Sequence, residues 1–130
     1  MSPSQQQINN LLELYQAGKY DEAEKLAVSL TEEFPKHPFA WKVLAAVLKQ
    51  MGKINESLVV SQRSVQLNPQ DTETHNNLGV ILKGLGRLDE AEQSFRQAIT
   101  LKADFAETHN NLGNTLKELG KLDEAEQSLR

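Results

Sequence analysis

TETHNNLGVILKGLGRLDEAEQSFR, residues 72–96, recurs 34 residues later as AETHNNLGNTLKELGKLDEAEQSLR, residues 106–130. The two copies differ at only six of their 25 positions. The same interval of 34 residues separates Gly18, Gly52, Gly86 and Gly120, so the period extends through the whole chain. A fixed period of this length is the signature of a solenoid, in which each copy is one supersecondary unit that stacks on its neighbours.

Each copy is predicted to form two helices. The first carries apolar residues at helical spacing, such as Leu78, Leu82 and Leu85, and should stop at the glycine of the turn. The second should open at an N-cap residue, namely Asp21, Asn55, Asp89 or Asp123, and end near Pro35 or Pro69. We also expect Pro38 at a first helical position and Asp104 as the cap of the following first helix. The predicted units are residues 4–37, 38–71, 72–105 and 106–130, the last truncated in its second helix after a turn at Gly120.

The composition argues against several classes of protein. The 130 residues carry a net charge of -4, which argues against a nucleic-acid partner because phosphate binding needs a basic face. The longest apolar run, Val43–Leu48, is far too short to span a bilayer, and the polar N-terminus does not resemble a signal peptide. The chain has no cysteine, so thiolate metal sites and disulfides are excluded. We expect a cytoplasmic protein without membrane association, metal or cofactor.

The repeated residues resemble the tetratricopeptide repeat family. The resemblance rests on a large aromatic residue in the first helix, a leucine–glycine pair, an alanine in the second helix and a closing proline: Trp41; Leu78-Gly79 and Leu112-Gly113; Ala23, Ala91 and Ala125; Pro35 and Pro69. It implies an all-α fold, a right-handed α-α superhelix of about 3.7 units. The sequence departs from the family at His75 and His109, which replace the aromatic residue, and at Ser57, which replaces the alanine.

The resemblance also implies a binding groove lined by the first helices. The most inward family position is occupied by Asn9, Val43, Asn77 and Asn111. Because an amide both donates and accepts, stacked asparagines could bind the backbone of an extended peptide whatever its sequence. This arrangement is similar to the asparagine ladder of O-linked N-acetylglucosamine transferase arrays. The alternative is that these asparagines are only solvated surface residues.

Other inward positions extend the candidate peptide-binding site. In the second unit Phe39, Val43, Lys42 and Lys49 form either a pocket for a ligand side chain or ordinary packing, and Asn114 lines the fourth unit. The family's clamp for a C-terminal carboxylate is excluded, because Glu107 stands where that clamp needs a lysine. His75 and His109 are one repeat apart, too far to share a metal ion. No pattern typical of a catalytic site is present, so we do not expect an enzyme.

We therefore expect a protein-interaction scaffold that binds a peptide or partner protein in the groove and forms part of a larger protein. One alternative is the substrate-recruiting arm of a glycosyl-, sulfo- or methyltransferase domain that lies outside this chain. Another is a self-assembling spacer, since the short last helix should leave the C-terminal end open for a homo-oligomer.

Overall fold

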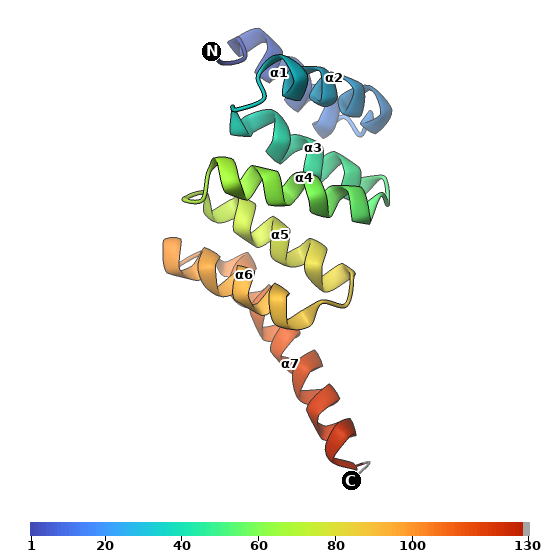
Figure 1. Cartoon of the computed structure of the whole chain (residues 1–130), viewed down its shortest axis with the longest axis vertical. Helices are drawn as coiled ribbons and strands as arrows, with labels where there is room; N and C mark the ends of the chain where they lie inside the picture. The colour runs from blue at the N-terminus through green and yellow to red at the C-terminus, as the bar shows by residue number, and fades with distance from the viewer. Residues whose placement is uncertain (129–130) are drawn as a thin grey trace. The chain divides into compact units, whose positions relative to one another are not determined.

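The computed structural model describes the backbone of residues 1–128 and the side chains of residues 1–121. Within that part the chain forms seven α-helices and no strand (Figure 1). They are α1 (Gln5–Gln16), α2 (Tyr20–Glu33), α3 (Pro38–Gln50), α4 (Ile54–Leu67), α5 (Thr72–Gly84), α6 (Leu88–Leu101) and α7 (Ala106–Ser128). The predicted all-α fold is confirmed. The helices divide between two compact units, with α1 to α4 in Met1–Pro69 and α5 to α7 in Gln70–Arg130.

The first unit consists of two helical hairpins, α1 with α2 and α3 with α4, and α2 packs against α3 (Figure 1). Its core is a cluster of aliphatic and aromatic side chains from α1, α2, the loop after α2, and α3: Leu11, Ala23, Ala27, Leu30, Phe34, Ala40, Val43, Leu44, Val47 and Leu48. These side chains recur at the three- and four-residue spacing that puts them on one face of each helix. Amphipathic helices therefore stabilise each other by burying their apolar faces.

Each of the first three hairpin turns is built on a glycine with a positive φ. Gly18 has φ +75°, and Gly52 and Gly86 have nearly the same value. The Gly18 amide donates to the Tyr15 carbonyl at 3.1 Å, and the Lys19 amide donates to the Leu14 carbonyl at 3.0 Å. This pair of bonds is the Schellman motif, which satisfies the last carbonyls of the helix and requires a left-handed residue. The glycine stops predicted at these three positions are confirmed.

The predicted caps of the second helices are wrong by two positions. α2, α4 and α6 begin after Lys19, Lys53 and Arg87, and none of these N-cap residues makes a side-chain capping bond. Asp21, Asn55 and Asp89 instead lie inside the first turn. The Schellman turn leads straight into the next helix, and a carboxylate in its first turn still acts favourably on the helix dipole.

The first helices do have capping side chains. Ser4 and Gln7 form a reciprocal capping box on α1, and the Asp71 carboxylate accepts the Glu73 amide at 3.2 Å. Pro38 occupies the first turn of α3, as predicted. Asp104 does not immediately precede a helix, because α7 begins at Ala106.

α7 contradicts the expected organisation of the last repeat. The helix is continuous from Ala106 to Ser128, so Gly120 makes no turn, and Asp123 lies within the helix rather than opening a new one. In the preceding repeat, the second helix α6 packs against α5 and buries Ala91, Phe95 and Ala98. The stretch after Gly120 is shorter and would bury less apolar surface by folding back against the preceding helix. Continuing the helix instead adds one backbone hydrogen bond per residue. Residues 129–130 of the predicted last unit lie outside the described residues.

The histidines that replace the family's aromatic residue differ in burial. The Trp41 indole donates from Nε1 to the Pro35 carbonyl at 3.0 Å. His109 Nε2, at the equivalent position, is 2.6 Å from the Ala103 carbonyl and therefore donates to it. An aromatic ring with an N–H thus fastens the chain segment before each of these first helices. His75 is buried, as expected of a packing position, but His109 is exposed.

Candidate functional site

In the second unit, α5 and α7 are joined by a buried network of polar side chains around Asn76. Asn76 is 1% exposed, and its Oδ1 accepts from Thr108 Oγ1 at 2.9 Å and from Asn111 Nδ2 at 3.1 Å. Its Nδ2 donates to Glu107 Oε1 at 3.4 Å. A buried amide with its hydrogen bonds made fixes one register between the two helices, because any slip would leave these groups unpaired.

The network positions Asn111, one of the predicted ladder residues, and Asn77 is next to Asn76 in the sequence. Asn77 and Asn111 are equivalent residues on α5 and α7, and both are partly exposed. Because Asn111 donates to Asn76, its side chain is held in one orientation while its edge remains accessible to solvent. Farther along the same two helices, Lys83 Nζ lies 3.7 Å from Glu118 Oε1. The result is a polar surface on first helices that carries two partly exposed amides one repeat apart, of which Asn111 is oriented by Asn76.

The other predicted site residues lie on α1 and α3 of the first unit and on α7 of the second. Asn9 lies in the first unit, exposed on α1, where its Oδ1 accepts from Gln5 Nε2 at 2.9 Å. Val43 is only 8% exposed and belongs to the core, with Phe39 packed against it, so ordinary packing describes these two residues better than a ligand pocket. Lys42 and Lys49 are partly buried on α3, and Asn114 is exposed on α7. Of the asparagines of the predicted ladder, Asn77 and Asn111 lie in the second unit and Asn9 lies in the first, and their binding role stays a prediction.

Asn76 and Thr108 were not predicted as important residues. A signal for them exists in the sequence, because the pattern Thr-His-Asn-Asn occurs in both near-duplicate copies, at residues 74–77 and 108–111. The pattern does not show which asparagine is buried. That is settled by α7 packing on α5, which covers Asn76 and leaves its counterpart Asn110 exposed.

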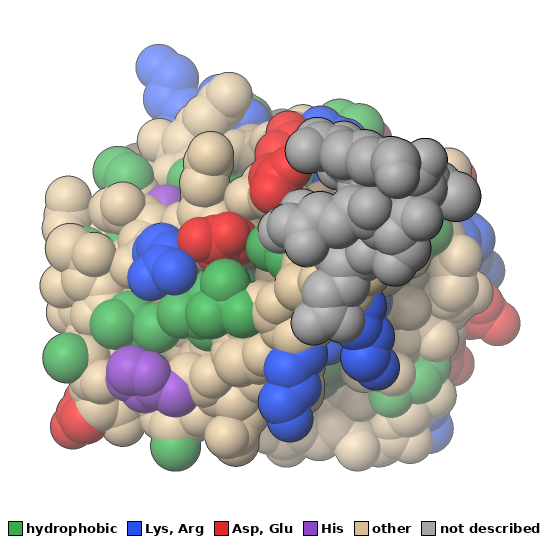
Figure 2. All heavy atoms as spheres, turned by 90° about the horizontal axis from the view of Figure 1, so that it is seen from below, with side chains coloured by type: hydrophobic (Ala, Val, Ile, Leu, Met, Phe, Trp, Pro, Cys, Tyr) green, Lys and Arg blue, Asp and Glu red, His purple; other side chains and the backbone are tan. Residues whose placement is uncertain are grey.

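On the face shown in Figure 2, acidic and basic side chains both lie beside an apolar patch. Within the described residues, no group of three or more His, Asp or Glu side chains is placed to hold a metal ion. In the same part of the chain, none of the helices has the length and hydropathy needed to cross a bilayer. The described polar contacts between α5 and α7 include the amide hydrogen bonds around Asn76 and the Lys83–Glu118 ion pair.

The fold and this surface define the chain as a helical-hairpin repeat protein. In such a protein, equivalent side chains of successive repeats lie in rows. Two family models match the chain: "TPR repeat" over residues 81–120 and "Tetratricopeptide repeat" over residues 61–93. Between them these models match residues 61–120, where the repeats are tetratricopeptide repeats. No curated protein gives a significant match to the sequence.

Several solved structures share the fold. The first tetratricopeptide domain of Spaghetti (RPAP3), bound to an HSP90 peptide, superposes with a TM-score of 0.84 at 21% identity, covering 92% of this chain and 98% of that one. The Sgt2 domain from Aspergillus fumigatus gives 0.87 at 12% identity, covering 95% and 85%. The O-GlcNAc transferase of Thermobaculum terrenum gives 0.80 at 22% identity, covering 85% of this chain but 21% of that enzyme. At these identities the likeness concerns the fold, and the recruiting-arm alternative stays a prediction.

Proposed function

We propose that this chain is a protein-interaction module that binds an extended segment of a partner protein on the surface formed by α5 and α7. The observation that carries the proposal is the pair of equivalent, partly exposed amides of Asn77 and Asn111, the second held by the buried Asn76. An amide held in a fixed orientation binds with a smaller loss of conformational entropy than a mobile one. The first tetratricopeptide domain of RPAP3, which shares the fold, is bound to an HSP90 peptide in its structure, and this supports the proposed class of function.

The geometry suits a peptide backbone. Neighbouring packed helices lie roughly 8–10 Å apart, which is close to the length of three extended residues at about 3.3 Å each. Equivalent amides on neighbouring first helices can therefore bond backbone groups that recur along one extended chain. Because each amide has both donors and an acceptor, this contact is independent of the peptide's side chains. Neighbouring side chains, among them Asn114, would then supply sequence preference.

Replacing both Asn77 and Asn111 by alanine tests the site. Peptides selected from a random displayed library against the intact chain serve as probes, and their affinities are measured by fluorescence anisotropy. We expect binding to weaken about tenfold or more, since each lost hydrogen bond contributes roughly 0.5–1.5 kcal/mol. The loss should be similar for selected peptides of different sequence, because the contact is to the backbone.

Asn110→Ala is the matched control, because Asn110 is the exposed neighbour of Asn111 on α7. This variant should bind the selected peptides as the parent chain does. If the double variant binds the selected peptides with unchanged affinity, the proposed amide site is wrong.

We propose a second candidate, self-association through α7, from a difference in the burial of one leucine. Leu48 and Leu82 are 3% and 4% exposed in their first helices, whereas the equivalent Leu116 is 40% exposed. Burying an exposed leucine contributes roughly 1.5–3 kcal/mol, so a second copy of the chain could gain stability by covering it.

If the chain self-associates, its apparent molar mass should rise with protein concentration. In sedimentation equilibrium the parent chain should form a dimer at high concentration, and Leu116→Lys should stay monomeric at the same concentration, because the ammonium would have to be desolvated. A parent chain that remains monomeric throughout would contradict this candidate without affecting the peptide site.

A further inference from the structure

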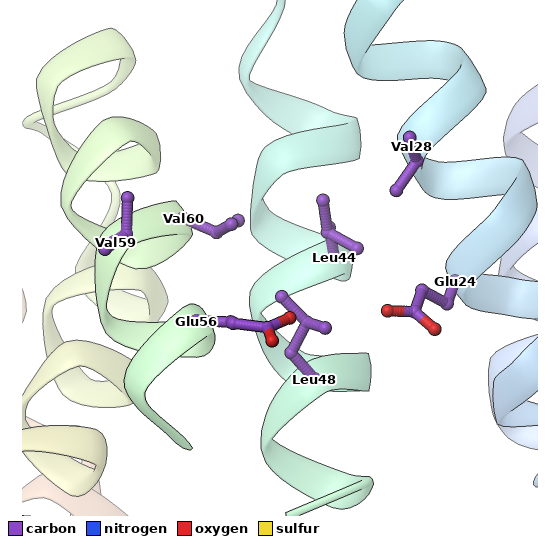
Figure 3. Close-up of a pocket in the computed structure, with 7 residues that line it drawn as sticks. All are labelled: Glu24, Val28, Leu44, Leu48, Glu56, Val59 and Val60. Carbon is purple, nitrogen blue, oxygen red and sulfur yellow. The ribbon is translucent and has the colours of Figure 1, made fainter. Parts of the chain in front are cut away.

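A groove lies between the second helices of the first unit. Its lining is mainly apolar, unlike the polar surface of α5 and α7. It has a volume of about 380 Å³, within the range of ligand sites. Figure 3 shows its walls and floor: Val28 and Glu24 come from α2, Val59, Val60 and Glu56 from α4, and Leu44 and Leu48 lie between them on α3. The lining is mainly aliphatic, with the two carboxylates near Leu48 at one end.

The valines of the groove are not required by the repeat. Val59 is 66% exposed and Val28 is 38% exposed, although both are large apolar residues. The second helix α6 carries Arg96, Gln93 and Ser94 at the positions equivalent to Val28, Val59 and Val60. Because α6 forms the same kind of hairpin with these polar residues, packing within the repeat does not explain the valines. An apolar surface that the fold does not need is typical of an interaction site.

The charged end of the groove is acidic overall. Lys53 Nζ lies 3.1 Å from Glu24 Oε2, and this hydrogen bond is the main cause that raises the pKa of Lys53. Glu56 and Asp21 act on the same ammonium group through their charges. Two carboxylates, Glu24 and Glu56, line this end of the groove, and Lys53 pairs with only one of them, so the end keeps a net negative charge that favours a cationic side chain.

We propose that this groove binds an amphipathic helix of a partner protein, with aliphatic side chains between α2 and α4 and a lysine or arginine beside Glu24 and Glu56. Two neighbouring helices with a third as floor form a furrow into which the apolar side of another helix fits, anchored at i, i+3 or i+4, and i+7. The acidic end favours a cationic side chain at one end of the bound helix, and this sets the direction in which that helix lies in the groove. This site is separate from the proposed peptide surface, since it lies on second helices of the other unit.

The experiment uses the full chain and a synthetic amphipathic peptide of about 15 residues, near the length at which an isolated helix becomes marginally stable. The peptide carries leucines at helical spacing with lysines beside them. Binding is measured by fluorescence anisotropy, and NMR shifts of the Val28, Val59 and Val60 methyl groups report the location. We expect binding of one peptide per chain with shifts confined to these methyl groups, and an affinity about threefold weaker for a version with glutamate in place of lysine.

The double substitution V28Q/V59Q is the test variant, because glutamine already stands at the equivalent positions Gln62 and Gln93. We expect the affinity to fall about tenfold while the helical content measured by circular dichroism is unchanged. The N77A/N111A chain is the control and should bind this peptide normally, which separates failure of this site from failure of the proposed function.

Three results would overturn the proposal: no binding of the leucine–lysine peptide, equal affinity for V28Q/V59Q, or loss of binding in N77A/N111A. Self-association of the parent chain that V28Q/V59Q abolishes would identify a second copy as the occupant and would equally overturn it.

Discussion

Gly79→Ala is expected to destabilise the second unit by about 1–3 kcal/mol, the range for overpacking a close-packed core. A Cβ on Gly79 would lie 2.5 Å from Cε1 and 2.7 Å from Cδ1 of Phe95. Phe95 is fully buried, so its ring cannot swing into solvent to make room. Either the ring leaves its preferred rotamer or α6 moves away from α5, and both lose packing. Urea unfolding followed by circular dichroism measures the change.

Gly113→Ala is the matched control for this prediction. Gly113 is the equivalent glycine on α7, and among the residues that the structure describes a Cβ there would meet nothing within 4 Å. With no clash, the higher helix propensity of alanine should stabilise the chain by up to about 1 kcal/mol. The same substitution should therefore have opposite signs at two equivalent positions. Equal effects would show that the Phe95 contact does not limit residue 79, and a double-mutant cycle with Phe95→Leu would isolate that contact.

The residues at the two positions of this contact differ along the chain. The first hairpin has Leu11 and Ala27 at these positions, the second has Ala45 and Ser61, and the third has Gly79 and Phe95. All of these positions are buried. In the first and third hairpins one helix carries a large residue and the other a small one, whereas both residues of the second hairpin are small. The clash expected for Gly79→Ala is therefore specific to the hairpin that carries Phe95.

The second large effect is expected for Asn76→Ala, with a loss of about 2–3 kcal/mol. The substitution removes the acceptor of both Thr108 and Asn111, and Thr108 is completely buried. A buried donor left without a partner costs roughly 1–3 kcal/mol. Native-state hydrogen exchange should show faster exchange in α5 and α7, because the contact between these helices is the one that is weakened.

Asn110→Ala again supplies the control. Asn110 occupies the same place in its repeat as Asn76 but is exposed, so its replacement should change stability by less than about 0.5 kcal/mol. Asn76→Asp gives a further check, since it keeps an acceptor for Thr108 but places a carboxylate beside Glu107 and should also be destabilising. A stable Asn76→Ala variant would mean that the network does not hold α7.

Local signals in the sequence were reliable where a short stretch decides its own conformation. The glycines at residues 18, 52 and 86 predicted three turns because only glycine adopts a positive φ without steric cost. Pro38 likewise fixed the start of a helix, since its ring presets φ. The cap positions of the second helices failed because a preceding Schellman turn, rather than the first Asp or Asn, determines where such a helix begins.

Gly120 shows the limit of the repeat pattern. It stands at the same place in its unit as Gly86, yet α7 passes through it, because a left-handed turn forms only when the following helix gains enough by packing back. Asn76, Asn77, Asn110 and Asn111 show the same limit at the candidate site. Identical sequence neighbours cannot reveal that one asparagine is buried in a network while another faces solvent.

The amino-acid sequence alone determined the helices, their period and the first three turns, because helical amphipathicity and backbone φ are properties of neighbouring residues. Tertiary structure decided which equivalent residues are buried, that α7 continues through Gly120, and that three valines of the first unit line an open groove between α2 and α4. Those outcomes depend on contacts between helices distant in sequence, and near-identical repeats acquire different roles only through the neighbours that cover them.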